Sequence, residues 1–149
     1  MARSAAARSD VLGETASMLG LRQRVRDPLE LAPIIRKGLP ANAFTSVAAR
    51  LDMSVQATAE SLGLAKRTIA RRIERNQPLD AEESERLVRL ARVLAQATLV
   101  LGSVEKARRW VAKPNRALGG EVPLQLLDTD VGAGAVFEEL GRIEHGVFV

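Results

Sequence analysis

The sequence predicts an all-α protein in which a helix-turn-helix domain precedes a smaller helical domain. Two observations predict this class. Apolar residues recur at three- and four-residue spacings along most of the 149-residue chain, as they do on one face of a helix. The chain has no Tyr, one Trp and three Phe, so its core must be built from Leu, Val, Ile and Ala, a composition that favours helices here.

Residues 1–27 are expected to form a flexible or partly helical leader. The first ten residues are mostly Ala, Arg and Ser without apolar periodicity, which indicates a flexible tail. From Val11 to Arg26 a weak helical pattern is broken by Gly13 and Gly20. This part is expected either to order on contact with something else or to stay mobile.

A DNA-binding domain is expected over residues 28–79. Asp27 as N-cap and Pro28 at the first helical position begin its first helix, and Gly38 ends that helix. Pro40 opens a second helix, in which apolar residues recur through Leu51.

Residues 54–75 then carry the pattern of a helix-turn-helix. Two short helical segments meet at Gly63, which tolerates the positive φ of a tight turn, and Ala59 is the small residue where the helices touch. Ile69 is expected to insert the second helix into the core. The side chains expected to project outward as ligands for phosphates and base edges are Lys66, Arg67, Thr68, Arg71, Arg72 and Arg75. The alternative is an ordinary solvated basic face.

Residues 80–102 are expected to form a long connecting helix. Asp80 and Glu83 make an acidic variant of the capping box at its start, and Gly102 ends it. Its apolar stripe from Leu87 to Leu101 can pack within its own domain. It can also serve a homodimer, since helix-turn-helix proteins often bind two half-sites.

Residues 103–149 are expected to form the second domain from short helices. Ser103 caps a helix ending near Val111, with Trp110 in the core. Asp130 is expected to be the N-cap of the last helix, whose first turns are weakened by glycines costing about 1 kcal/mol each relative to alanine. The residues that this helix is expected to direct toward a core are Val131, Val136, Phe137, Leu140 and Ile143.

Charge is divided unevenly along the chain. Residues 1–116 hold 21 basic and 12 acidic residues, whereas residues 117–149 hold one basic and six acidic residues. The basic part is suited to a polyanion, and the acidic end to another protein. No apolar run approaches the about 20 residues that span a bilayer, there is no secretion signal and there is no Cys, so we expect a cytoplasmic protein without a membrane segment.

No combination of residues in the sequence indicates catalysis. There is a single histidine, His145, no Cys, no glycine-rich phosphate loop after a strand and no His-Glu metal spacing. We therefore expect a binding protein without enzymatic activity, cofactor or metal.

A family resemblance rests on four runs: KPNRALGG at 113–120, VPL at 122–124, LLDT at 126–129 and LGRIEHGVF at 140–148. Together they resemble the toxin-binding C-terminal domain of the Xre/MbcA/ParS antitoxin family. The upstream helix-turn-helix resembles the Xre-type DNA-binding domain of that family. The resemblance covers about residues 28–149.

The resemblance implies an antitoxin of a RES-Xre type II toxin-antitoxin system. Its toxin would be a RES-domain protein, related to ADP-ribosyltransferases, that consumes NAD. The antitoxin would bind over the toxin's active site and repress its own operon. The implied DNA contacts are Lys66, Arg67, Thr68, Arg71 and Arg72. The implied toxin-facing residues are Asn115, Arg116, Arg142, Glu144, His145 and the C-terminal Val149.

Several alternatives stay open from the residues alone. Arg142 follows Glu138 by four residues, so it can form an ordinary helical ion pair or enter a pocket built for phosphate. His145 is expected to be a surface or capping group. The whole chain can also be a stand-alone repressor with a C-terminal dimerisation or sensor domain, or a protein-binding scaffold that contacts no DNA.

Overall fold

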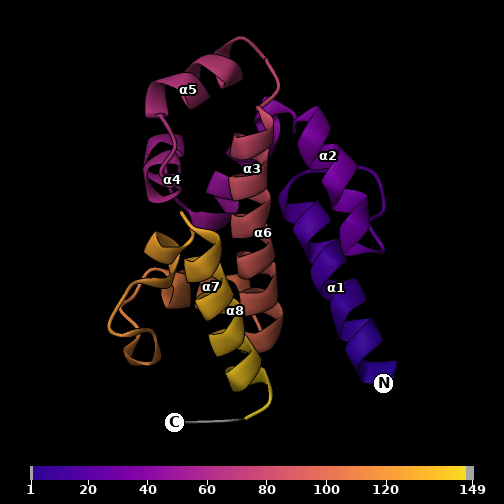
Figure 1. Cartoon of the computed structure of the whole chain (residues 1–149), viewed down its shortest axis with the longest axis vertical. Helices are drawn as coiled ribbons and strands as arrows, with labels where there is room; N and C mark the ends of the chain where they lie inside the picture. The colour runs from indigo at the N-terminus through magenta and orange to yellow at the C-terminus, as the bar shows by residue number, and fades with distance from the viewer. Residues whose placement is uncertain (1, 147–149) are drawn as a thin grey trace.

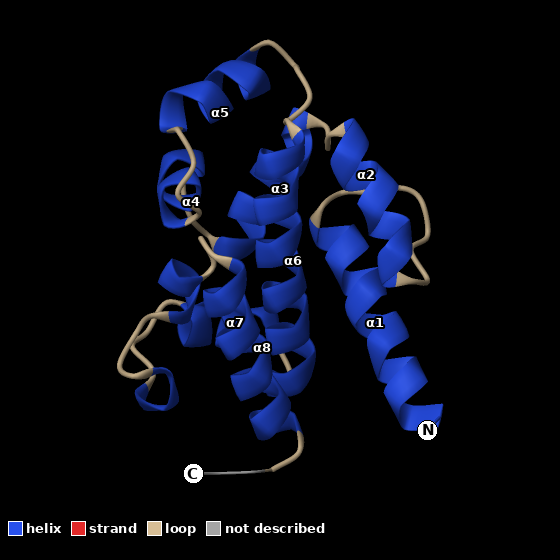
Figure 2. Cartoon of the chain, in the orientation of Figure 1, coloured by secondary structure: helices blue, strands red, loops and turns tan. Residues whose placement is uncertain are grey.

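A computed structural model of the chain describes the backbone of residues 2–146 and the side chains of residues 10–146. Within this range the protein is all-α, as predicted, and contains no strand (Figure 2). Its α-helices are α1 Ala2–Met18, α2 Leu31–Lys37, α3 Ala41–Leu51, α4 Val55–Ser61, α5 Lys66–Glu74, α6 Ala81–Leu101, α7 Val104–Val111 and α8 Asp130–Glu144. Its 3₁₀ helices are η1 Pro28–Glu30, η2 Arg116–Leu118 and η3 Pro123–Leu126.

The long helix α6 is the central element of the fold. It packs against α1 and α2 on one side and against α7 and α8 on the other (Figure 1). Leu87, Leu90 and Leu94 on its apolar stripe are fully buried. The predicted capping box is present, because Asp80 Oδ1 accepts from Glu83 N and Glu83 Oε1 accepts from Asp80 N, both at 2.8 Å. The stripe therefore packs within the chain.

The leader, expected to be flexible or partly helical, contains the helix α1. Helix α1 begins at Ala2, and its C-terminal part packs on α6. Leu12, Ala16 and Leu19 are buried, and Val25 is buried in the segment that follows. These residues are too sparse to define an amphipathic helix by themselves, and it is the apolar face of α6 that gives them a partner. The stretch from Leu12 to Val25 thus contributes side chains to the core.

The start of α8 also differs from the expectation. Thr129, not Asp130, is the N-cap, and its side chain accepts from Gly132 N at 3.0 Å. Val131 is 87% exposed and lies outside the core, whereas Val136 and Leu140 are fully buried as predicted. A Cβ on Gly132 would lie 2.0 Å from the carbonyl oxygen of Leu126, so this glycine permits the close approach of η3 to α8.

No single helix in the described residues is long and apolar enough to cross a membrane. Helices α6 and α7 reach that length and composition only together, and they meet at a bend of 120°. Their apolar side chains belong to one continuous core that also includes residues of α1, α3, α5 and α8.

Candidate nucleic-acid interface and a second surface at the opposite end

The helix-turn-helix predicted at residues 54–75 is formed by α4 and α5. Ser54 Oγ accepts from Ala57 N at 3.0 Å and caps α4, and Gly63 has the positive φ of 68° that the turn requires. Ala59 and Ile69 are fully buried, so both helices are fixed to the core as expected. The outer face of α5 is thereby held toward solvent at one end of the molecule (Figure 1).

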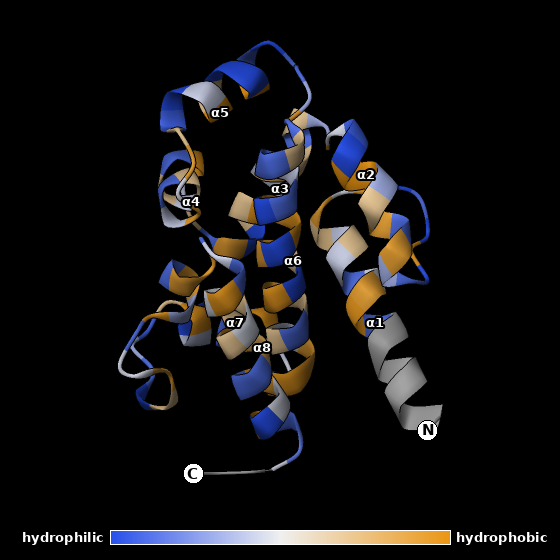
Figure 3. Ribbon diagram, viewed as in Figure 1, coloured by the Kyte–Doolittle hydropathy of each residue, from blue (hydrophilic) through white to orange (hydrophobic). Residues whose placement is uncertain are grey.

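Most of the predicted DNA ligands lie on this outer face. Lys66, Arg67 and Arg71 are exposed, and Thr68 is half-buried. Lys66 Nζ lies 3.8 Å from Glu60 Oε2, an exposed pair that contributes little. None of the ion pairs formed among residues 10–146 includes Arg67 or Arg71. The hydrophilic colouring of α5 in Figure 3 reflects this basic face, which is suited to a polyanion.

Arg72 departs from the prediction that it projects outward. Its Nε forms an ion pair with Glu83 Oε1 at 2.7 Å, off the axis of a hydrogen bond, and its Nη2 lies 3.7 Å from Asp80 Oδ2. The Arg72 side chain is 23% exposed and that of Glu83 only 9%. Since a nearly buried carboxylate needs a counter-charge, Arg72 turns back to the capping box of α6. Arg72 thus links α5 to the start of α6.

Two arginines of α6, which the sequence did not single out, hold neighbouring elements in place. Arg86 Nη1 donates to the carbonyls of Leu62 at 2.9 Å and Gly63 at 3.1 Å, in the turn after α4. Arg89 Nη1 donates to the carbonyl of Leu127 at 3.0 Å, after η3. Both satisfy helix-end carbonyls that would otherwise lack a donor. No sequence signal distinguishes them from solvated arginines on a helix.

The predicted toxin-facing residues lie near the opposite end from α5. Asn115 Oδ1 accepts from Ala117 N at 2.9 Å and begins η2, and Asn115 N donates to the carbonyl of Glu121 at 2.9 Å. Arg116 is exposed, and η2 packs against α8. The structure therefore brings the 115–121 loop and α8 together.

Arg142 forms an ion pair within α8, but not with the residue expected. Its Nε and Nη2 donate to Glu139 Oε2 at 2.9 Å and 2.7 Å, whereas the sequence pointed to Glu138. Glu144 and His145 are exposed, and His145 is the C-cap of α8, in agreement with its interpretation as a surface or capping group. Val149 lies outside the described residues.

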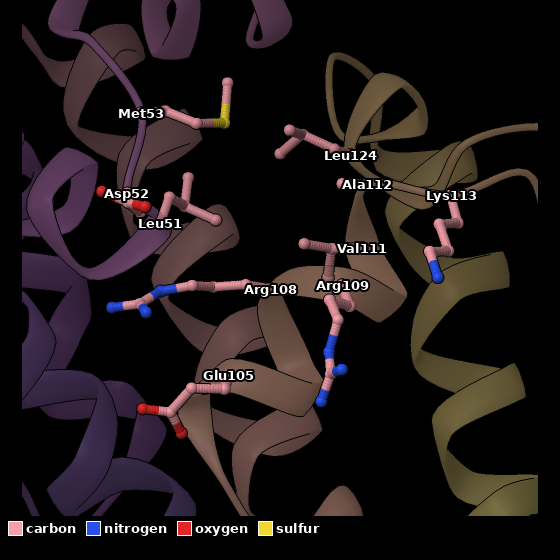
Figure 4. Close-up of a pocket in the computed structure, with 10 residues that line it drawn as sticks. All are labelled: Leu51, Asp52, Met53, Glu105, Arg108, Arg109, Val111, Ala112, Lys113 and Leu124. Carbon is pink, nitrogen blue, oxygen red and sulfur yellow. The ribbon is translucent and has the colours of Figure 1, made fainter.

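An open cleft of about 620 Å³, which the sequence did not indicate, lies between the α3–α4 turn, α7 and η3 (Figure 4). Met53, Val111 and Leu124 give it an apolar lining, and the exposed Arg109 and Lys113 add positive charge at its edge. In the sequence, the feature that could have indicated a surface here is the pair of basic residues in the last turn of α7. Among residues 10–146 no three His, Cys, Asp or Glu side chains are grouped to hold a metal ion.

Comparison with known proteins agrees with this arrangement. The antitoxin Xre-like helix-turn-helix domain matches residues 30–92, and the antitoxin Xre/MbcA/ParS C-terminal toxin-binding domain matches residues 96–146. An "Antitoxin Xre" of Photorhabdus laumondii is 33% identical over 118 residues, covering 78% of this chain and 80% of that protein. A "Prs ADP-ribosylating antitoxin" of a Sphingobium species is 31% identical over 130 residues, covering 81% and 82%. An "Antitoxin Xre" of Pseudomonas putida is 45% identical over 80 residues, or 54% of this chain, and the match spans half of that protein's length.

Proposed function

Because this chain belongs to the Xre/MbcA/ParS family of antitoxins, we propose that it neutralises a cognate RES-domain toxin and represses its own operon. The observation that carries the proposal is the separation of two surfaces on one chain. A basic helix-turn-helix face lies at one end, and the residues of the toxin-binding motif lie toward the other. The protein acts by binding, without a cofactor, in the cytoplasm where its operator is found.

The DNA-binding role is assigned to the outer face of α5. Lys66, Arg67 and Arg71, with Thr68 beside them, contact phosphates and base edges of the operator. Arg72 contributes indirectly, because its ion pair with Glu83 fixes the orientation of α5. The protein binds two half-sites as a homodimer. Light scattering of the free protein and of its DNA complex gives the molar mass of each, and two chains are expected in both.

The toxin-binding role is assigned to the surface where the 115–121 loop meets α8. Arg116 is exposed there, and Arg142, whose Nε and Nη2 both donate to Glu139 Oε2, can exchange that carboxylate for an anionic group of the partner, because a guanidinium pairs with carboxylate and phosphate alike. Asn115, Glu144, His145 and Val149 complete the proposed contact. The name of the Sphingobium relative, "Prs ADP-ribosylating antitoxin", supports a toxin whose chemistry consumes NAD.

Purification of the tagged full chain from its native host tests this function. We expect a RES-domain protein to co-purify, and NAD consumption to appear when the complex is denatured and the partner is refolded alone. Recovery of only the chain itself and DNA would contradict neutralisation and leave a stand-alone repressor. Point variants are preferable to truncation here, because removal of α8 would uncover the buried Val136 and Leu140.

A further inference from the structure

We propose that the DNA interface extends beyond α5 to the last turn of α2, where Arg36 and Lys37 bind phosphates flanking the operator. This inference rests on the proposed DNA-binding function and adds a second, sequence-independent contact to it. Both side chains are exposed, and both lie in the last turn of α2. Phosphate contacts of this kind fix the register of a protein on a duplex without reading its bases.

The end of α2 is fixed in place by backbone contacts. Gly38 ends the helix with a φ of 95°, and a Cβ there would lie 2.2 Å from the carbonyl oxygen of Leu79 and 3.7 Å from Pro78 Cβ. Leu79 N donates to the carbonyl of Leu39 at 2.9 Å, and Leu39 N donates to the buried Ser84 Oγ at 2.9 Å. The basic turn is therefore anchored to the segment that leads from α5 into α6.

This anchoring places the two basic regions at the same end of the molecule. Arg75 is the C-cap of α5, and only Asn76, Gln77 and Pro78 separate it from Leu79, whose N donates to the carbonyl of Leu39. The ribbon has the hydrophilic colour both at the end of α2 and along much of α5 in Figure 3. None of the ion pairs formed among residues 10–146 uses Arg36 or Lys37, so no intramolecular carboxylate occupies them there. A duplex lying across α5 would thus meet a second basic contact.

An ordinary structural role competes with this proposal. Cations in the last turn of a helix stabilise the helix by interacting with the negative end of its dipole. That role would affect the stability of α2 but not the salt dependence of DNA binding. The two roles are therefore separable by measuring DNA affinity and thermal unfolding on the same variants.

The experiment uses the full chain, a labelled fragment from upstream of its own gene and an unrelated fragment of equal length. Fluorescence anisotropy at several salt concentrations gives the slope of log K against log salt. For R36A/K37A we expect the negative slope to become shallower by about 1.8, since each phosphate contact contributes about −0.9. The affinities for the two fragments should decrease by similar factors. The charge-conserving R36K/K37R should retain the wild-type slope. The control R109A/K113A removes the same charge near the cleft beside α7 and should leave the slope unchanged.

Two results would overturn the proposal. An unchanged slope for R36A/K37A, with or without a lower melting temperature, would assign these residues to α2 alone. An equal loss in R109A/K113A would assign the effect to net charge. Arg71→Ala serves as the separate check on the proposed function. If this variant binds the upstream fragment as tightly as the wild type, the proposal that α5 contacts the operator is wrong, whatever the α2 variants show.

Discussion

The two ends of this protein present their functional residues in different ways. On α5, Arg67 and Arg71 project from a helix whose inner side is held by the buried Ile69, and they form no ion pair with residues 10–146. At the other end, Asn115 caps η2 and Arg142 pairs with Glu139, so proposed partner contacts also maintain local structure. The proposed DNA-binding surface thus presents arginines that form no ion pair among residues 10–146, whereas the proposed toxin-binding surface includes side chains that already bond within the chain. The first can be recognised from residue chemistry, and the second only through resemblance.

Both ends are nevertheless parts of one core. Arg86 and Arg89, one turn apart on α6, bond to the turn after α4 and to the end of η3 respectively. Surface substitutions that leave this core intact are therefore the right way to test whether the ends function separately. The predictions below compare the two ends in that way, from the largest expected effect to the smallest.

The double variant R67A/R71A should lose at least about 30-fold in operator affinity, because each arginine contact with a base is worth about 1–3 kcal/mol and about 1.4 kcal/mol corresponds to tenfold. Its inhibition of the toxin should be unchanged. Anisotropy on the upstream fragment and an activity assay of the toxin measure the two properties. Equal loss of both would show that the ends do not function separately.

Gly132→Ala should destabilise the C-terminal half by about 1–3 kcal/mol, because the added Cβ would overlap the carbonyl of Leu126. Gly134→Ala is the matched control. It lies two residues further along α8 with nothing within 4 Å of its added Cβ, and should gain up to about 1 kcal/mol from helix propensity. Urea unfolding measures both. If the two variants changed the free energy of unfolding in the same direction, the close approach of η3 to α8 would be excluded.

Arg72→Ala should lower the free energy of unfolding by about 1 kcal/mol, because it leaves the nearly buried Glu83 without its counter-charge. Arg71→Ala, one residue earlier at an exposed position, should leave stability unchanged while weakening DNA binding. Chemical unfolding of the two variants side by side measures the contrast. A fully stable Arg72→Ala variant would return Arg72 to the set of direct DNA ligands.

Arg142→Ala should change stability by only a few tenths of a kcal/mol, as expected for a partly exposed pair three residues apart on a helix. Its effect on toxin inhibition should be much larger than its effect on unfolding. If instead unfolding is strongly affected and inhibition is not, Arg142 is a structural residue of α8.

The features predicted correctly from sequence are those set by neighbours along the chain. The capping box of Asp80 and Glu83, the Ser54 cap and the turn at Gly63 each depend on a few consecutive residues. The features that sequence analysis missed depend on distant partners. The packing of α1 requires the face of α6, and the inward turn of Arg72 requires Glu83 on another helix. The exposed position of Val131 likewise depends on how α8 is placed in the fold, since the spacing of apolar residues along α8 predicted that Val131 faces the core.

The central claim is tested most directly by titrating the purified full chain into the proposed partner, a RES-domain toxin, while NAD consumption is measured. Three forms are compared: the wild type, R67A/R71A at the α5 end, and R116A/R142A at the partner-binding end. We expect the wild type and R67A/R71A to stop NAD consumption at the same ratio of chain to toxin, and R116A/R142A to require a large excess. Continued NAD consumption at any ratio of wild-type chain, or equal inhibition by all three forms, would contradict the account.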